Sequence, residues 1–593
     1  MKTLYTLLFA CLFSLDAHAL SAQEYMQRFM TYSKWSQNLP DQPDEQFFIF
    51  IAEDSPLSIK LREKWLYQLA KKKDWLNFSK YYKPTLDINL QCFALSAQYN
   101  QGQVQEAFTA ATPLWLSGES QPQACNQLFE LMLKSDNFNQ DLITQRVQQA
   151  LDKRNLQLAR YLLKQYKQPR IKDEQLLISI YQNPGRIIQL DGNGLHSDFY
   201  LYGLKRLVSM NMDQALKLWK NPKTKKILSV EQQQAFLSHV ALYKAMRNHP
   251  DADDWFSQVS PQYYNDILLE WEIRAALKKQ NWAQVQQLIN HSANKDSPCW
   301  QYWLARAQES LGQKDQAKAL YLQLAAVRNY YGFLASLRLH KSFSFQNENP
   351  INNMAVLKPY ESVTENIKSL YNSKQDLQAS RMLNDFVSEL PKDDQSALVY
   401  WVANDLQWHG KSVYLSNNEI LNNQLALRFP LAHSESVAAF SKNYQIPPEL
   451  IYAIIRQESG FRYDVVSTVG ARGLMQIMPA TANMVAKREK IDYSDKGQLF
   501  LTQKNINIGV AYLQQLGKRY EQHPVLMAAA YNAGPRQVNF WLKNHPPKEI
   551  DIWIETLPWH ETRNYLKNVI AFYAVYQYRL RHKSDLQPFL KAL

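Results

Sequence analysis

Residues 446–461, Ile446-Pro-Pro-Glu-Leu-Ile-Tyr-Ala-Ile-Ile-Arg-Gln-Glu-Ser-Gly-Phe461, predict a short helix that carries a candidate general acid. Pro448 suits the first helical position, because the N–H that proline lacks has no partner there. Gly460 can adopt the left-handed conformation that ends a helix. Glu458 shares one helix face with three isoleucines, Ile451, Ile454 and Ile455. Burial on this face and the helix dipole both raise the pKa of a carboxyl group in the last turn, which suits proton donation near neutral pH. The alternative is a solvated glutamate that ends a helix.

Two further motifs follow this helix. The loop Ser467-Thr-Val-Gly-Ala-Arg-Gly-Leu-Met-Gln-Ile-Met-Pro-Ala-Thr481 contains two glycines that indicate an irregular turn with exposed backbone. Ala530-Tyr-Asn-Ala-Gly-Pro535 comes later in the chain. Together with Gln457-Glu-Ser459, these segments resemble the lysozyme-like domain of lytic transglycosylases, and three motifs in one order are more specific than any one of them.

The resemblance implies a mechanism with a single carboxyl group. Glu458 would protonate the glycosidic oxygen between N-acetylmuramic acid and N-acetylglucosamine, and an oxocarbenium-like centre would form. The resulting carboxylate would then deprotonate the C6 hydroxyl of the same muramoyl residue and close a 1,6-anhydro ring. An intramolecular nucleophile already has a high effective concentration, so the enzyme needs only to orient it and exclude water.

The same resemblance implies six substrate-binding residues beside the acid. Two polar side chains would hydrogen-bond the sugars, a methionine would form an apolar wall, and a tyrosine hydroxyl would bond the catalytic carboxylate. An asparagine beside that tyrosine and a glutamate at the groove floor complete the set. These residues are Ser467, Gln476, Met478, Tyr531, Asn532 and Glu561. For Met478 alone, a place in the core is the favoured alternative.

Most glycosidases use a second carboxylate, and the sequence offers two candidates for it. Asp464 follows the helix on a loop, where a turn or capping role is favoured. Glu561 begins a long helix, and its alternative role is an N-terminal charge paired with Arg563. Three tryptophans, Trp541, Trp553 and Trp559, could stack on sugar rings, although packing in the core is favoured for each.

The composition indicates a large, mostly helical and basic protein. Its 593 residues are too many for one ordinary core, and 16 glycines stand against 34 tyrosines and 15 tryptophans. The net charge of +13 favours a polyanionic partner: nucleic acid, acidic lipid or the anionic cell-wall polymer. Nucleic acid is disfavoured, because the sequence contains no zinc finger, RNA-recognition motif or Lys/Arg block.

We therefore expect an all-α protein with three parts after a leader. Residues 20–345 show short amphipathic helices with small residues at helix crossings, as in Trp303-Leu-Ala-Arg-Ala307, which predicts an α-solenoid. The segments Tyr330–Leu337 and Trp115–Cys125 resemble the soluble, ring-shaped lytic transglycosylases, which implies a superhelical ring. Residues 346–428 predict a linker and a small helical domain, and residues 429–593 the mostly α, lysozyme-like catalytic domain.

Residues 1–19 predict a cleaved secretory signal. One positive charge, a short apolar run and the motif Ala17-His-Ala19 precede the expected cut after Ala19. Cys11 lies within the apolar run, so we do not expect a lipid anchor. No other run approaches the roughly 18 apolar residues that span a bilayer. The expected location is the periplasm, without a transmembrane segment.

Three cysteines remain after the signal is removed. An oxidising compartment permits one disulfide, and Cys92–Cys125 is favoured because this pair is closest in sequence, which leaves Cys299 as a free, buried thiol. Three reduced cysteines are the alternative.

The motif His560-Glu-Thr-Arg-Asn564 has asparagine where a zinc protease needs its second histidine, so no metal site is expected. No other cofactor is expected either.

The leading hypothesis is a monomeric, exolytic peptidoglycan lytic transglycosylase whose partners are glycan strands and other cell-wall enzymes. One alternative is a hydrolase of the goose-lysozyme type on the same fold. Another is a non-catalytic wall-binding scaffold built on the solenoid.

Overall fold

The computed structural model describes residues 21–136, 138–544 and 549–590. Within these residues the secondary structure is helical, without a strand, and β-type pairing is limited to two isolated bridges, Val466–Arg472 and Arg472–Ile477. The prediction of an all-α fold is confirmed for these residues. The predicted signal, residues 1–19, lies outside them.

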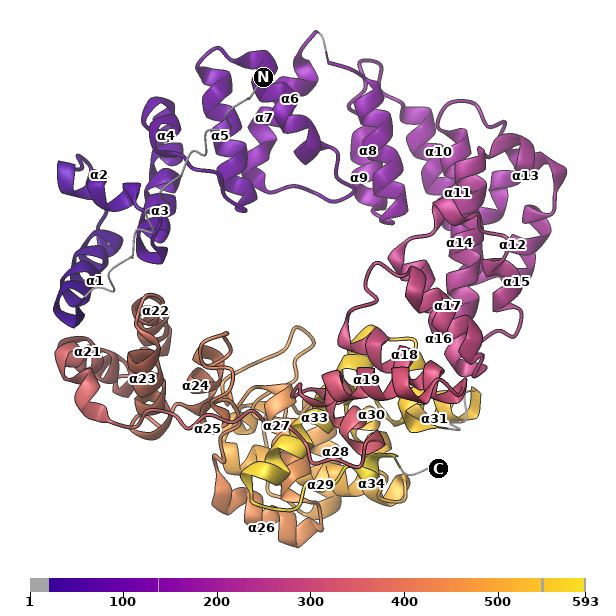
Figure 1. The fold of residues 1–593 in the computed structure, drawn as a ribbon. Coiled ribbons are helices and arrows are strands. Elements are labelled where there is room, and N and C mark those ends of the chain that lie inside the picture. Colours follow the sequence, from indigo (N-terminus) through magenta and orange to yellow (C-terminus); the bar gives the residue numbers. More distant parts are fainter. Residues whose placement is uncertain (1–20, 137, 545–548, 591–593) are drawn as a thin grey trace, which may run out of the picture. The chain divides into compact units, whose positions relative to one another are not determined.

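The chain divides into two compact units (Figure 1). The first combines Met1–Gln68 with Pro350–Asn422, and the second combines Leu69–Asn349 with Asn423–Leu593. The helices of the first unit are α1 (Ala22–Gln37), α2 (Glu45–Ala52), α3 (Pro56–Lys72, whose end belongs to the second unit), η4 (Met354–Tyr360), α21 (Glu361–Asn372), α22 (Asp376–Val387), α23 (Lys392–Asn404) and α24 (His409–Leu415).

The second unit contains a long series of helices before residue 349. They are α4 (Trp75–Tyr81), α5 (Ile88–Asn100), α6 (Val104–Trp115), η1 (Gln123–Cys125), α7 (Asn126–Lys134), α8 (Asp141–Asp152), α9 (Leu156–Leu163), α10 (Ile171–Gln182), η2 (Pro184–Gln189), α11 (His196–Met210), α12 (Met212–Trp219), α13 (Pro222–Ile227), α14 (Val230–Met246), α15 (Ala252–Phe256), η3 (Pro261–Tyr263), α16 (Asp266–Lys278), α17 (Trp282–His291), α18 (Pro298–Ser310), α19 (Lys314–Ala325) and α20 (Tyr330–Arg338).

Its C-terminal helices form the domain that contains Glu458. They are α25 (Leu425–Arg428), α26 (Ser434–Tyr444), α27 (Pro448–Glu458), α28 (Pro479–Glu489), η5 (Lys496–Phe500), α29 (Thr502–Arg519), α30 (Pro524–Ala533), α31 (Pro535–Asn544), α32 (Ile550–Thr556), α33 (His560–Arg579) and α34 (Gln587–Leu590).

In the first unit, helices from its two separate chain segments pack against each other. The Tyr25 hydroxyl donates to the Phe386 carbonyl, and the two rings lie 5.6 Å apart. Lys60 pairs with Asp385 at 2.8 Å, so α1 and α3 both contact α22. The first helices that the structure describes therefore pack with residues 350–422, while the predicted boundaries at 345 and 428 remain predictions.

In the second unit, neighbouring helices are joined by tight turns with one left-handed residue. Gly102 (φ +87°) joins α5 to α6, and Gly312 (φ +82°) joins α18 to α19. The same turn uses Arg154 between α8 and α9 and Gln280 between α16 and α17. A left-handed residue satisfies the last carbonyls of one helix and returns the chain antiparallel to it. These short hairpins are the helix pairs that the predicted solenoid requires.

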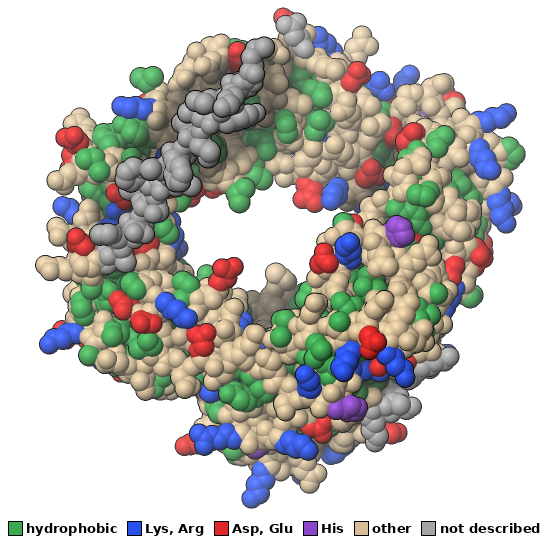
Figure 2. Space-filling view, viewed as in Figure 1, with side chains coloured by type: hydrophobic (Ala, Val, Ile, Leu, Met, Phe, Trp, Pro, Cys, Tyr) green, Lys and Arg blue, Asp and Glu red, His purple; other side chains and the backbone are tan. Residues whose placement is uncertain are grey.

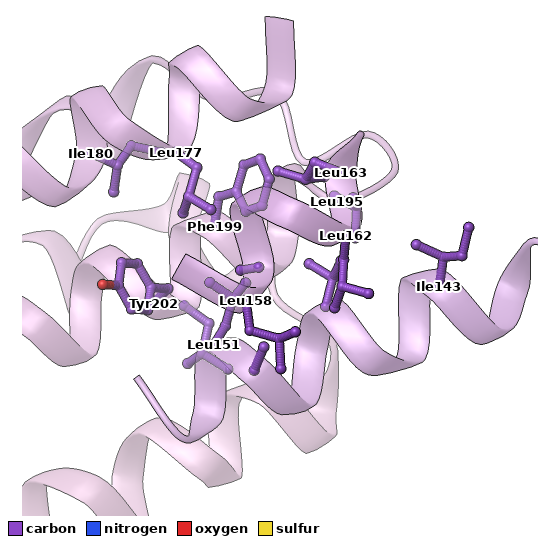
Figure 3. Packing of buried hydrophobic residues seen from close by; sticks show 14 of the residues in the cluster. Ile143, Leu151, Leu158, Leu162, Leu163, Leu177, Ile180, Leu195, Phe199 and Tyr202 are labelled. Atoms are coloured by element: carbon purple, nitrogen blue, oxygen red, sulfur yellow. The ribbon is translucent and has the colours of Figure 1, made fainter. Parts of the chain in front are cut away.

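A continuous apolar core runs along these pairs. Leu151 of α8, Leu158 of α9 and Phe199 of α11 point toward one another, and Leu177 of α10 joins them (Figure 3). Each pair buries its apolar face only against its neighbours, as in other helical repeat proteins. Such a series can lengthen without a larger core, which accounts for the length of the chain.

Lys, Arg, Asp and Glu side chains are intermixed over the face drawn in Figure 2. The Lys and Arg side chains on this face therefore do not form a single basic patch. None of the helices in the described part of the chain is long and apolar enough to cross a membrane.

The Cys92–Cys125 disulfide is present and joins α5 to η1, which confirms the predicted pairing. Cys299 is unpaired, as predicted, but it is only partly buried.

We expect the double substitution Cys92→Ala/Cys125→Ala to destabilise the solenoid, because the bond closes a loop with a sequence separation of 33. Loop-closure entropy predicts a loss of about 3–4 kcal/mol in the free energy of unfolding. Urea unfolding followed by circular dichroism measures it. A reductant should produce the same loss in the wild type and none in the double variant, and equal stability of the two oxidised proteins would contradict the prediction.

Candidate active site

The α27 helix positions Glu458 as predicted from the sequence. It begins at Pro448 and ends at Glu458, and Gly460 adopts a left-handed conformation (φ +56°) just beyond it. Ile451, Ile454 and Ile455 are fully buried on the face that leads to Glu458. The Glu458 side chain itself is half-buried at the end of this apolar helix face.

The surroundings of Glu458 raise its pKa, so that a substantial protonated fraction persists at neutral pH. Burial raises the pKa of Glu458 to about 7, a hydrogen bond from Tyr565 lowers it, and the negative charge of Glu561 raises it. The Tyr565 hydroxyl donates to Glu458 Oε1 at 2.7 Å. A carboxyl group with this pKa can donate a proton and later accept one at the same pH.

The tyrosine that bonds the acid is Tyr565 of α33, and the prediction that Tyr531 makes this bond is wrong. The Tyr531 hydroxyl donates instead to the Met475 carbonyl at 2.7 Å, which ties α30 to the loop after α27. The negative charge of Glu458 contributes to the raised pKa of Tyr531, which indicates that Tyr531 lies near the acid. Tyr565 lies four residues after Glu561, one helical turn along the same face. That spacing was the available sequence signal.

The two polar loop residues that were predicted to bind sugar also form hydrogen bonds that stabilise the loop. Ser467 Oγ accepts from the Ala471 N–H at 3.0 Å. Gln476 Nε2 donates to the carbonyls of Val465 and Gly473 at 3.1 and 2.9 Å. Their free lone pairs remain available to a sugar, and sugar binding by Ser467 and Gln476 stays a prediction. Met478 is 38% exposed at the start of α28, so the alternative of a core position does not hold for it.

Asn505 of α29 holds the same loop and was missed by the sequence analysis. It is fully buried; its Nδ2 donates to the carbonyls of Arg472 and Leu499, and its Oδ1 accepts from the Met475 N–H at 2.8 Å. An asparagine within a helix carries no motif of its own, so no sequence signal points to this role. Two bonds from one side chain thus hold the loop beside Glu458, and a third ties the same side chain to Leu499 of η5.

We predict that Gly473→Ala disrupts the loop far more than Gly470→Ala. Both glycines have positive φ, +74° and +94°, which costs any L side chain about 1 kcal/mol. A Cβ at Gly473 would also lie 2.2 Å from the Leu499 carbonyl oxygen, whereas a Cβ at Gly470 meets nothing within 4 Å. Thermal unfolding and activity should both decline strongly for Gly473→Ala and slightly for Gly470→Ala; equal effects would contradict the prediction.

Asn532 and Glu561 lie where α30 meets the start of α33. Asn532 Oδ1 accepts from the Thr562 hydroxyl at 2.9 Å. Glu561 is exposed in the first turn of α33, and Arg563 donates to the Leu557 carbonyl, so the alternative Glu561–Arg563 pair does not form. Substrate binding by Asn532 and Glu561 stays a prediction.

The remaining candidates are an exposed aspartate and three tryptophans. Asp464 is exposed and lies 3.5 Å from Arg462, in keeping with a role in the turn. Trp541 and Trp553 are buried, as expected for core residues. Trp559 is 49% exposed, and its ring packs edge-to-face with that of Trp541, with the ring centres 5.4 Å apart.

Comparisons with known proteins agree with this arrangement. The family model of the transglycosylase SLT domain matches residues 435–554, which include Glu458 and the motif at 530–535. The soluble lytic murein transglycosylase of Escherichia coli strain K12 is 28% identical over 577 residues, 94% of this chain and 88% of its own. The putative soluble lytic murein transglycosylase of Haemophilus influenzae is 29% identical over 341 residues, 57% of this chain and 56% of its own.

Two solved structures extend the similarity along the whole chain. The inactive mutant of lytic transglycosylase Slt from Pseudomonas aeruginosa is 30% identical, with a TM-score of 0.80 over 96% of this chain and 95% of its own. The 70 kDa soluble lytic transglycosylase of Escherichia coli is 27% identical, with a TM-score of 0.73 over 96% of this chain and 93% of its own. The chain therefore belongs to the soluble lytic murein transglycosylase family.

Proposed function

We propose that this lytic transglycosylase cleaves the β-1,4 bond between N-acetylmuramic acid and N-acetylglucosamine of peptidoglycan and leaves 1,6-anhydro ends. The observation that carries the proposal is Glu458, a half-buried carboxyl group. Burial raises the pKa of Glu458 to about 7 although its hydrogen bond from Tyr565 acts in the opposite direction. The negative charge of Glu561 also raises the pKa of Glu458, but Glu561 itself is exposed. The names of the relatives, soluble lytic murein transglycosylases, support the same substrate.

Glu458 performs both proton transfers. In the first step it protonates the glycosidic oxygen, and the bond to C1 of the muramoyl residue breaks as an oxocarbenium-like centre develops. In the second step the carboxylate removes the proton of the C6 hydroxyl of the same residue, and the C6 oxygen bonds to C1. The proton lost in the first step is regained in the second, so the reaction consumes no water. With a pKa near 7, both forms of Glu458 are populated at neutral pH.

Six residues around the acid would hold the sugars. Three of them lie between the loop after α27 and the start of α28, and the other three lie on α30 and in the first turn of α33. They are Ser467, Gln476, Met478, Tyr531, Asn532 and Glu561.

We extend the proposal to exolytic action in the periplasm. The sequence Ala17-His-Ala19 after an apolar run supports export. The description of the relatives as soluble enzymes supports a protein that acts on the wall without a membrane anchor.

Mass spectrometry of fragments released from purified sacculi tests this function. We expect fragments with 1,6-anhydro-muramoyl ends, each lighter by one water than the corresponding reducing fragment, and disaccharide units from the earliest time points. Reducing ends would instead indicate a hydrolase of the goose-lysozyme type. Long fragments that shorten with time would contradict exolytic action alone, and absence of release would favour the scaffold.

A further inference from the structure

The α33 helix has two functional faces. Glu561, Thr562 and Tyr565 lie at spacings of three and four residues and contact the surroundings of the acid: Tyr565 bonds Glu458, and Thr562 bonds Asn532. Residues at spacings of two, by contrast, project to opposite sides of a helix. The opposite face of α33 therefore carries Arg563 and Lys567, four residues apart.

Lys567 is bound to a buried carboxylate that also contacts the solenoid. Its Nζ lies 2.8 Å from Oε2 of Glu555, a residue of α32 that is 1% exposed. Arg274 of α16 lies 3.3 Å from Glu555 Oε1 and also donates to the Glu555 backbone carbonyl at 3.2 Å. Tyr331 of α20 donates to Glu555 Oε2 at 2.7 Å. One carboxylate thus links α33 to two solenoid helices.

Arg563 adds a second contact on this face of α33. Its guanidinium donates to the Leu557 carbonyl at 2.6 Å and lies 5.3 Å from the ring centre of Trp271 in α16. Arg563 is 4% exposed, so this contact is shielded from solvent. The two contacts, one helical turn apart, fix both the rotation and the height of α33 against the solenoid.

The bonds at Glu555 favour the ionised form of its carboxyl group. Burial alone would raise the pKa of Glu555, but Lys567 and Arg274 outweigh it and hold this pKa well below its usual range. A buried ion that loses one partner is left uncompensated, which is strongly unfavourable. The α33 helix cannot turn on α16 and α20 without that loss.

We infer that Lys567 and Arg563 are positioning residues: they anchor α33 to the solenoid through Glu555 and Trp271 and thereby hold Tyr565 against Glu458. The inference rests on the proposed function, because it assigns these residues to the orientation of its acid. It also assigns the solenoid segment 266–338 a role in catalysis beyond any contact with glycan.

A second ionic cluster at the same junction provides a matched control. Arg306 of α18 pairs with Asp551 of α32 and, at 2.6 Å, with Glu549, and the Tyr302 hydroxyl donates to Asp551 at 2.9 Å. Arg306, Asp551 and Tyr302 are also buried, and the cluster also joins α32 to the solenoid, but the described bonds involve no side chain of α33. Its loss should affect stability without turning α33.

The test compares Lys567→Met with Arg306→Met in the full chain, with kcat, KM and the pH profile measured on soluble glycan strands. The titratable groups that act on Glu458 are Tyr565 and Glu561 of α33 and Tyr531 of α30, and those around Glu555 are Lys567, Arg563, Arg274, Tyr331 and Cys299. Since Tyr565 stabilises the Glu458 carboxylate, its displacement moves the basic limb of kcat/KM to higher pH.

We expect Lys567→Met to lower kcat about tenfold or more, because small misplacement of a catalytic group is costly. KM should change little, and the basic limb should move to higher pH. Lys567→Arg, which keeps the charge, should restore most of kcat. Arg306→Met should lower the unfolding temperature but leave the limb in place. In a Tyr565→Phe background, Lys567→Met should move the limb no further.

The same profile from Lys567→Met and Arg306→Met would overturn the inference, as would a further shift in the Tyr565→Phe background. If Lys567→Met does not fold, Tyr331→Phe serves instead, because it removes one bond to Glu555 and leaves both cations in place. A folded Tyr331→Phe protein with the wild-type profile would also overturn it. Failure of the wild type to release anhydro ends would instead refute the proposed function.

Discussion

Glu458→Gln is expected to lower kcat on glycan strands by about 10²–10⁴-fold, the contribution of a well-placed general acid or base. The amide keeps the shape of the side chain and can accept the Tyr565 bond, but it cannot donate a proton to the glycosidic oxygen. Because the same group also acts as the base in the second step, we expect no partial reaction to accumulate.

The matched control is Asp464→Asn, which removes the nearest carboxylate in sequence by the same chemical change. Asp464 is exposed and lies 3.5 Å from Arg462, so its substitution should leave kcat unchanged. Binding to purified sacculi, measured by co-sedimentation, should be retained in Glu458→Gln. Undiminished lysis by this variant, or an equal loss in Asp464→Asn, would contradict the role assigned to Glu458.

Tyr565→Phe should lower kcat by about 10–100-fold, the loss that corresponds to one hydrogen bond to a charged group. The bond at 2.7 Å orients Glu458 and stabilises its carboxylate form. Without it the pKa of Glu458 rises, the acid stays protonated to higher pH, and the basic limb of the kcat/KM profile moves upward. A downward movement, or none, would contradict the assignment.

Glu561→Gln should shift the same limb in the opposite direction. The negative charge of Glu561 raises the pKa of Glu458, so its removal favours the carboxylate and the limb moves to lower pH. Glu561 is exposed, so solvent screens this interaction and the effect should be smaller than that of Tyr565→Phe. The two opposite shifts, measured in one buffer series, separate a direct effect on Glu458 from general damage.

The local features of the site could be predicted from the sequence because they depend on neighbouring residues. The start of α27 at Pro448, its end before Gly460 and the burial of Ile451 all follow from helix capping and periodicity. The Cys92–Cys125 bond was favoured by short separation and is present.

Contacts between distant segments could not be predicted in this way. The hydroxyl that bonds Glu458 belongs to Tyr565, 107 residues away, whereas the family resemblance had implied Tyr531 for this bond. The bonds of Asn505 to the loop and the packing of α1 against α22 depend on the tertiary fold alone. Periodicity identifies which face of a helix is buried, but not which element covers it.

The central claim is that Glu458 transfers a proton twice and that the substrate's own C6 hydroxyl closes the reaction without water. Digestion of purified glycan strands in ¹⁸O-enriched water, followed by mass spectrometry of the released ends, tests it most directly. We predict 1,6-anhydro ends with no ¹⁸O incorporated. Reducing ends that carry one ¹⁸O atom would contradict the account.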